Sequence, residues 1–353
     1  MDNGYIYIRK NYNSLDVSKF ICAILIICAH FASEWGSFPV VVDYAFSIYV
    51  IAVPFFFCCS GFLFFNKLNA LPTEEAKKKY FISYQKRIWT MYGLWTLVYV
   101  PFILVSWIRS GEFGVRLLRW IHTSIVFQTY STIWFLPALA IGIALAYWIF
   151  KRLSRDKCAI LIVALYLIGT LGYSYSFIFE GTFVEKIYEI YKLVFKTTRN
   201  GLFNALPFIY FGYLFAKKDE NAKYNKTIVN AIYAIIFLLC VVVESFLLKI
   251  KFNVTGMDFV LSLLPFTYFF MQTLLSIDLK DRKIYTWLRK SSLLMFVSQR
   301  LFLTALPSVM PRLFGFLYTN SYLGIFLVLI FTIVFSVGTI ALSKKIKFLK
   351  WMM

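Results

Sequence analysis

A lysine and a histidine in the first apolar stretch are spaced so that one helix would carry both on the same face. Lys19 precedes His30 by eleven residues, and eleven steps of about 100° end about 20° beyond three full turns. At ~1.5 Å per residue, the two side chains would stand about 16 Å apart along the helix axis. The cation could hold an anionic donor while the imidazole, which titrates near neutral pH, acts as a general base. Equally, His30 could hydrogen-bond to a neighbouring helix, and Lys19 could simply anchor the helix end at the membrane surface.

Three more charged residues stand within or beside apolar stretches, where charge is costly and is by default a sign of function. Glu244 and Arg300 lie inside such stretches, and one of them would neutralise the other. Arg199 stands directly before Asn200-Gly201 at the edge of another stretch. It could clamp a carboxylate or polarise a carbonyl oxygen, or it could extend to the membrane surface.

Helices that cross a membrane must position these residues. The chain has 353 residues, of which 60% are hydrophobic and 15% charged, whereas an ordinary globular domain is about 45–50% apolar and about 25% charged. A spanning helix needs ~20 mostly apolar residues. The sequence predicts ten such helices, at residues 17–35, 43–65, 88–108, 132–150, 158–178, 200–217, 227–248, 257–276, 291–310 and 320–343. We expect residues 1–353 to form one all-α integral membrane bundle, with two further helices, at 113–128 and 183–198, lying in the membrane interface.

The net charge of +20 would suggest nucleic acid in a soluble protein. If the N-terminus is cytoplasmic, however, most of the 37 Lys and Arg fall in the inner segments, as the positive-inside rule requires. We therefore expect both termini in the cytoplasm, an inner face that meets anionic membrane lipid, and no nucleic-acid partner. The six cysteines lack the spacing of metal ligands, and no P-loop or dinucleotide fingerprint is present, so we expect no bound metal.

Taken in order, these features resemble the acyltransferase-3 family of integral membrane acyltransferases. The resemblance rests on Leu15-Asp16, His30, Pro54 to Phe62, Lys86-Arg87, Trp134 to Leu139, and Arg199-Asn200-Gly201 up to Gly212. It is closest to the membrane half of vancomycin-resistance-type membrane serine racemases, which have runs similar to Trp134–Leu139, Thr198–Gly201 and Glu244-Ser245. The printed sequence has no soluble domain after its last predicted span, so we do not expect it to racemise serine.

The resemblance implies a bacterial plasma-membrane or inner-membrane enzyme. It would move an acyl group, usually acetyl, from cytoplasmic acyl-CoA to a hydroxyl of a cell-envelope glycan or lipid-linked sugar. The family's catalytic histidine matches His30, and Arg199 would stabilise developing negative charge. Acyl-CoA would be a co-substrate rather than a tightly bound cofactor, held by Lys19, Lys86 and Arg87. The remaining candidates, for substrate binding, are Trp134, Glu244 and Arg300.

Three positions depart from the family pattern. The family often has arginine where this chain has Lys19, and lysine lacks the bidentate fork of a guanidinium. Thr90 replaces the second arginine of a pair that starts at Arg87, and Gln299-Arg300 stand where the family usually has His-Pro. These losses leave open a second function, a transporter or exporter of a small polar solute such as serine. Glu244 and Arg300 would then line the solute path.

Overall fold

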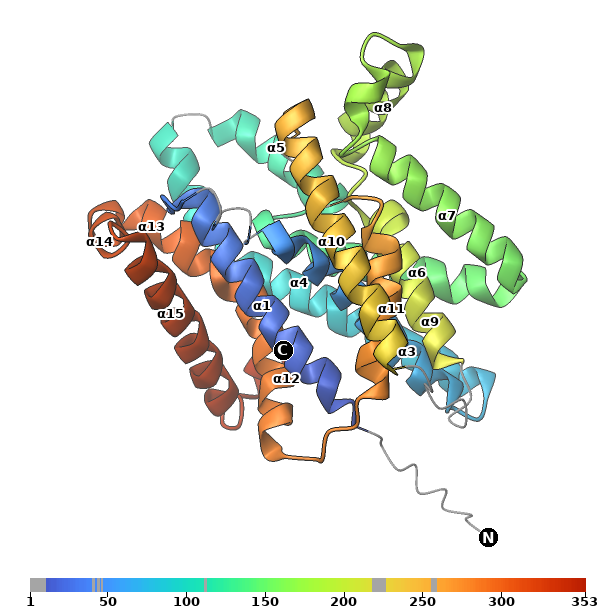
Figure 1. The fold of residues 1–353 in the computed structure, drawn as a ribbon. Helices are drawn as coiled ribbons and strands as arrows, with labels where there is room; N and C mark the ends of the chain where they lie inside the picture. Colours follow the sequence, from blue (N-terminus) through green and yellow to red (C-terminus); the bar gives the residue numbers. More distant parts are fainter. Residues whose placement is uncertain are drawn as a thin grey trace.

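Helices form nearly all of the described chain (Figure 1). The computed structural model describes residues 11–39, 42, 45, 47–110, 113–217, 227–254 and 259–353, and these ranges contain no β-strand. The α-helices are α1 (Asn13–Glu34), α3 (Ala52–Asn69), α4 (Glu74–Ser110), α5 (Phe113–Val126), α6 (Phe135–Arg152), α7 (Arg155–Leu171), α8 (Phe183–Phe195), α9 (Leu206–Ala216), α10 (Thr227–Phe252), α11 (Leu263–Ser276), α12 (Lys283–Arg300), α13 (Leu306–Val309), α14 (Pro311–Leu317) and α15 (Ser321–Leu342). Short 3₁₀ segments lie at η1 (Ser47–Ile51), η2 (Ser131–Trp134), η3 (Ser176–Phe179) and η6 (Lys347–Met352).

Seven helical stretches in the described ranges are long and apolar enough to cross a membrane. They are Asn13–Glu34, Ile48–Asn69, Glu74–Arg109, Arg116–Arg152, Thr227–Phe252, Lys283–Val309 and Ser321–Leu342. Gly201–Ala216 and Leu263–Ser276 are shorter apolar helices. The all-helical, multi-pass membrane architecture is therefore confirmed, whereas ten spans and two cytoplasmic termini stay predictions.

Helix length explains the difference in span number. For example, the predicted span at 158–178 corresponds to α7, which has 17 residues. At ~1.5 Å per residue α7 is about 25 Å long, which is less than the ~30 Å hydrocarbon core. The first residues of the predicted spans at 43–65 and 257–276 lie outside the described residues.

Helices α1 and α12 run side by side through the bundle (Figure 1). An ion cluster around a buried carboxylate joins their N-terminal halves. The Asp16 carboxylate, in a residue only 2% exposed, accepts hydrogen bonds from Arg289 Nε at 2.8 Å and Nη2 at 2.6 Å. Lys19 Nζ lies 2.9 Å from the other Asp16 oxygen. A buried carboxylate is tolerated only when it is paired and hydrogen-bonded, so this cluster fixes how α1 lies against α12.

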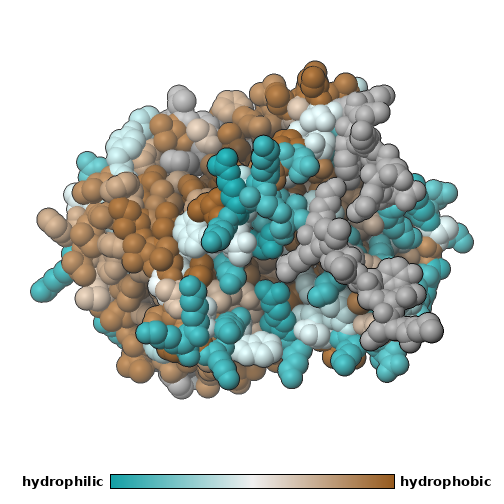
Figure 2. All heavy atoms as spheres, turned by 90° about the horizontal axis from the view of Figure 1, so that it is seen from below, coloured by the Kyte–Doolittle hydropathy of each residue, from teal (hydrophilic) through white to brown (hydrophobic). Residues whose placement is uncertain are grey.

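The same end of the molecule is polar. Asn69 at the end of α3 donates to the Ala216 carbonyl at the end of α9, and Asn13 at the start of α1 donates to Asp281, just before α12. Figure 2 shows hydrophilic side chains spread over this end of the molecule. This is the face that the positive-inside pattern predicts to meet the cytoplasm.

Two glycines allow α3 and α9 to pack with their backbones in contact. A Cβ atom added at Gly212 would overlap the Phe62 nitrogen and the Cys58 oxygen. One added at Gly61 would lie 2.8 Å from the Ile209 oxygen. Small residues serve this purpose where membrane helices approach closely.

Two π-helical segments begin one or two residues after an arginine. Segment η4 (Gly201–Ala205) leads into α9, and segment η5 (Leu301–Ala305) joins α12 to α13. The Ala205 N–H donates to the carbonyl of Asn200, five residues earlier, at 3.0 Å. Such segments occur frequently at functional sites, so we expect a functional site around Arg199 and Arg300.

Candidate active site

Hydrogen bonds around Gln299 fix the proton on the His30 ring. Gln299 Nε2 donates to the Phe296 carbonyl at 2.9 Å, so its amide oxygen must face the other way. That oxygen, Oε1, lies 2.9 Å from His30 Nδ1. Because an amide oxygen can only accept, the neutral imidazole carries its proton on Nδ1. The lone pair that can take up a proton is therefore on Nε2.

Arg300 lies beside this pair, on the last residue of α12. It forms an ion pair with Glu34 at the end of α1, and the arginine is only 8% exposed. The end of α1 meets α12 and η5 a second time through Trp35, whose indole N–H donates to the Leu303 carbonyl at 2.8 Å. In an α-helix the Leu303 carbonyl would accept from the backbone N–H of residue 307, but Pro307 has no N–H. The indole N–H of Trp35 donates to that carbonyl instead.

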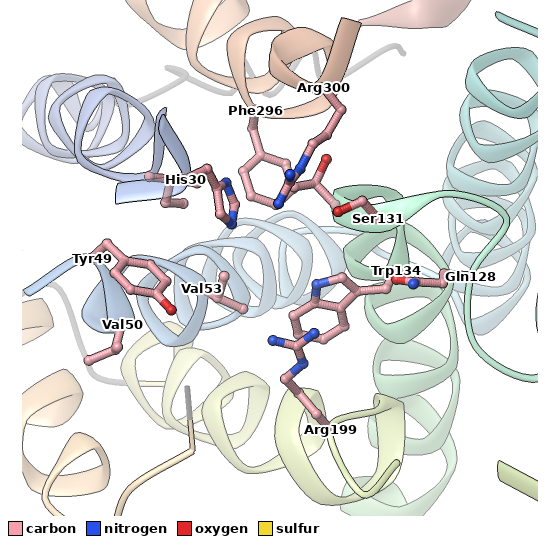
Figure 3. Close-up of a pocket in the computed structure, with 12 residues that line it drawn as sticks. His30, Tyr49, Val50, Val53, Gln128, Ser131, Trp134, Arg199, Phe296 and Arg300 are labelled. Carbon is pink, nitrogen blue, oxygen red and sulfur yellow. The ribbon is translucent and has the colours of Figure 1, made fainter. Parts of the chain in front are cut away.

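Arg199 lies opposite His30 and Arg300 (Figure 3), and hydrogen bonds hold the backbone around it in place. Thr198 Oγ1 donates to the Gly169 carbonyl of α7 at 2.7 Å. Asn200 caps η4 by accepting from the backbone N–H groups of Leu202 and Phe203 at 3.0 and 3.2 Å, as asparagine commonly does at a helix start. The guanidinium carbon of Arg199 stands 4.5 Å from the centre of the Trp134 ring, a cation–π contact.

These side chains surround one cavity of about 210 Å³. Figure 3 shows His30, Tyr49, Trp134, Arg199 and Arg300 reaching into the same space from different elements. The lining residues are Ile26, His30, Tyr49, Val50, Val53, Gln128, Ser131, Thr132, Trp134, Arg199, Phe296 and Arg300. The cavity thus combines an imidazole with two guanidinium groups, three hydroxyl groups and one amide. This is the composition expected where a proton is moved and negative charge is stabilised.

A second cavity, of about 600 Å³, adjoins the first. The two share Gln128 and Ser131 in their linings. The wall of the second combines aromatic rings, among them Trp107 and Trp120, with hydroxyl groups such as Thr304. Flat apolar rings with a few polar groups are typical of binding sites for organic molecules.

Comparison with known proteins identifies the family of the chain. The acyltransferase-3 model, described as an acyltransferase domain, matches residues 12–341. The chain belongs to the acyltransferase-3 family. No solved structure matches the chain.

Curated relatives of this acyltransferase-3 protein carry racemase names. An amino-acid racemase from Enterococcus faecalis is 32% identical over 65% of this chain and 31% of its own length. A serine/alanine racemase from Enterococcus gallinarum is 27% identical over 73% of this chain and 36% of its own length. The chain thus spans about a third of the length of the curated relatives it matches.

Four of the eight predicted site residues of this acyltransferase-3 chain meet in the first cavity. They are His30, Trp134, Arg199 and Arg300. The three predicted acyl-CoA contacts lie elsewhere: Lys19 pairs with Asp16, Lys86 is exposed, and Arg87 donates to the Met353 carbonyl at 2.9 Å. Their role in binding acyl-CoA stays a prediction.

Glu244 also lies outside the cavity lining. Its carboxylate accepts hydrogen bonds from the backbone N–H groups of Leu261 and Ser262 at 2.6 and 2.8 Å, and from the hydroxyl groups of Tyr175 and Ser262. The prediction that Glu244 and Arg300 neutralise each other is wrong, because Arg300 pairs with Glu34. Glu244 instead satisfies backbone donors just before α11, where a helix start leaves N–H groups unpaired.

Sequence reasoning missed Glu34 as a member of this site. One signal was available: Glu34 follows His30 by four residues, and residues four apart share a helix face. Tyr49, Gln128 and Ser131 had no such signal. Their segments lie outside regular α-helices, at 47–51 and 127–134, and only tertiary packing brings them to the cavity.

Proposed function

We propose that this protein is a membrane O-acyltransferase of the bacterial plasma membrane. It would move an acyl group, usually acetyl, from cytoplasmic acyl-CoA to a hydroxyl of a cell-envelope glycan or lipid-linked sugar. The observation that carries the proposal is the contact of His30 Nδ1 with Gln299 Oε1 at 2.9 Å, beside a cavity that two arginines also line.

In the proposed reaction, His30 Nε2 takes the proton of the acceptor hydroxyl as its oxygen attacks the thioester carbonyl carbon. Arg199 stabilises the negative charge that develops on the carbonyl oxygen, and Arg300 holds the substrate. The carbon–sulfur bond then breaks, and the CoA thiolate recovers the proton from His30. Each bond formed is thereby matched by one broken, and His30 returns to its starting state.

The sizes of the two cavities fit separate places for the acyl donor and the acceptor. About 210 Å³ corresponds to roughly seven water molecules at ~30 Å³ each, so the first cavity would admit the acylated tip of CoA and not its nucleotide. The adjoining cavity of about 600 Å³ has room for a sugar ring. An acceptor seated there would reach His30 past Gln128 and Ser131.

The experiment that tests the proposal uses both histidines of the chain. A strain lacking the gene is complemented with the wild type, His30→Ala or His122→Ala, and acetylation of its surface glycans is measured by mass spectrometry. His122 lies on α5 and outside the lining of the first cavity, so its variant serves as the matched control. We expect acetylation to be lost with His30→Ala alone. Unchanged acetylation in that strain would remove His30 from the mechanism.

A second candidate function is transport of a small polar solute such as serine. Two observations favour it: the first cavity matches a small solute in volume, and the relatives are named for amino-acid racemisation. Uptake of radiolabelled serine into proteoliposomes, measured beside acetyl-CoA hydrolysis in the same preparation, separates the two functions. Serine uptake without hydrolysis would favour transport.

A further inference from the structure

The first cavity is unusually rich in cations for a space inside a helical bundle. Its lining contains Arg199 and Arg300 but, in the described part of the chain, no Asp or Glu. Glu34 reaches Arg300 from outside the lining. Two guanidinium groups that face one small cavity favour an occupant with negative charge.

Arg300 presents a specific edge to such an occupant. Glu34 binds Nη1, while Nε is buried and has no hydrogen-bond partner among the described residues. A guanidinium grips a carboxylate through two parallel N–H groups, and Nε with Nη2 forms one such fork. The fork that Glu34 leaves unused is therefore the natural seat for a second carboxylate.

Two neutral groups around the cavity also lack partners within the described ranges. They are Gln128 Oε1 and Thr132 Oγ1, both buried. Most buried polar atoms in folded proteins have a hydrogen-bond partner, so three incomplete atoms around one cavity indicate a polar occupant. The Gln128 oxygen can only accept, and it calls for a hydroxyl or amino group on that occupant.

We propose that this cavity binds a carboxylate that carries a hydroxyl or amino group nearby. The carboxylate would lie on the Nε–Nη2 edge of Arg300, and the neighbouring donor would reach Gln128. Two sources share this chemistry: a small hydroxy or amino acid, and an acidic sugar whose ring extends into the adjoining cavity. Binding of this kind can be measured without any acyl transfer, so its failure is distinct from failure of the proposed reaction.

The test is isothermal titration calorimetry of the purified full chain in detergent with two matched pairs of probes. L-lactate is compared with lactamide, and D-glucuronate with D-glucose, since each pair differs in the carboxylate. We expect the wild type to bind at least one acid at least tenfold more tightly than its neutral partner. Tight binding of lactate identifies a small acid as the occupant, and tight binding of glucuronate alone identifies an acidic sugar.

Variants assign the binding to Arg300. The double substitution Glu34→Gln with Arg300→Gln removes both members of the ion pair, so no lone buried charge threatens folding. We expect it to abolish the preference for the acid. Arg312→Gln, at an exposed position on α14, should leave the preference unchanged. Equal affinity for acid and neutral partner in the wild type, no binding of either acid, or an unaltered preference in the double variant would overturn the proposal.

Discussion

Gln299 Oε1 lies 2.9 Å from His30 Nδ1, so a residue near the end of α12 decides which ring nitrogen of a residue on α1 carries the proton. In many hydrolases a carboxylate holds the histidine in this way. Here a neutral amide does so, and it is itself oriented by the Phe296 carbonyl. The amide fixes the tautomer without adding a negative charge beside the imidazole.

Gln299→Leu should lower kcat for acyl transfer about 10- to 100-fold, by analogy with removal of the group that orients a metal-ligating histidine. The KM for acyl-CoA should change little, because Gln299 does not line the cavity. Gln299→Glu should keep an acceptor at His30 Nδ1 but lose the hydrogen bond to the Phe296 carbonyl. It should shift the pH–rate profile to higher pH, since an anion at Nδ1 stabilises the imidazolium. Both are measured by acetyl-CoA turnover in proteoliposomes. A leucine variant with wild-type kcat would show that the amide has no positioning role.

Glu34→Gln should destabilise the protein. It leaves the buried Arg300 guanidinium without its carboxylate, and breaking a buried pair costs ~3–5 kcal/mol. The loss should fall at the low end of that range because the Glu34 side chain is 27% exposed. Unfolding in detergent is the measurement. In a double-mutant cycle, the double variant Glu34→Gln with Arg300→Gln should lose less stability than the two single variants lose in sum. Strict additivity of the losses would mean that the two residues do not interact.

Gly212→Ala should weaken packing between α3 and α9. The added methyl group would overlap backbone atoms at Cys58 and Phe62, and overpacking of this kind costs about 1–3 kcal/mol. Gly93→Ala on α4 is the matched control, since a Cβ there meets nothing within 4 Å. That change should be neutral or stabilising, because alanine is the better helix former. Equal thermal midpoints for the two variants would count against close backbone contact at Gly212.

The loop before α12 should respond to acid. Hydrogen bonds from Asn13 and Asn11 hold the pKa of Asp281 below its ordinary value of 3.8. A lowered carboxyl pKa adds stability above that ordinary value, and this stability is lost as the pH falls through the lowered value. Asn13→Ala should therefore destabilise the fold near neutral pH, with a smaller effect in acid where Asp281 is protonated. Unfolding curves at several pH values check this, and an effect independent of pH would show that Asn13 acts only through its bond to the Leu279 carbonyl.

Much of the architecture follows from the sequence, because apolar stretches of sufficient length can only be buried as membrane helices. The amphipathic segments predicted at 113–128 and 183–198 likewise correspond to α5 and α8. The number of spans stays a prediction, since composition alone cannot show that α7 stops after 17 residues. Hydropathy also does not reveal the π segments, because a π turn differs from an α turn in its hydrogen bonds and not in the residue types it requires.

The candidate site was predictable in its residue types and not in its pairings. His30, Trp134, Arg199 and Arg300 stood out because charge, imidazole or a marked motif occurred in apolar surroundings. The sequence prediction gives Glu34 no role and pairs Arg300 with Glu244. Charge balance shows that a buried arginine needs a carboxylate, but only the packing of α1 against α12 selects Glu34 for Arg300.

The π segment η5 makes the cavity sensitive to where a residue is lost as well as to which residues are present. A π turn holds one residue more than the α turn it replaces, so deleting one residue between Leu301 and Ala305 would close the turn to α geometry with little rotation of α13 relative to α12. Deleting one residue within α12, between Arg289 and Arg300, would instead rotate Arg300 by about 100° relative to the first half of the helix. Arg300 would then turn away from Glu34, with every cavity side chain still present in the sequence. Loss of a residue in the π segment would thus spare a site that the same loss in the preceding helix would dismantle.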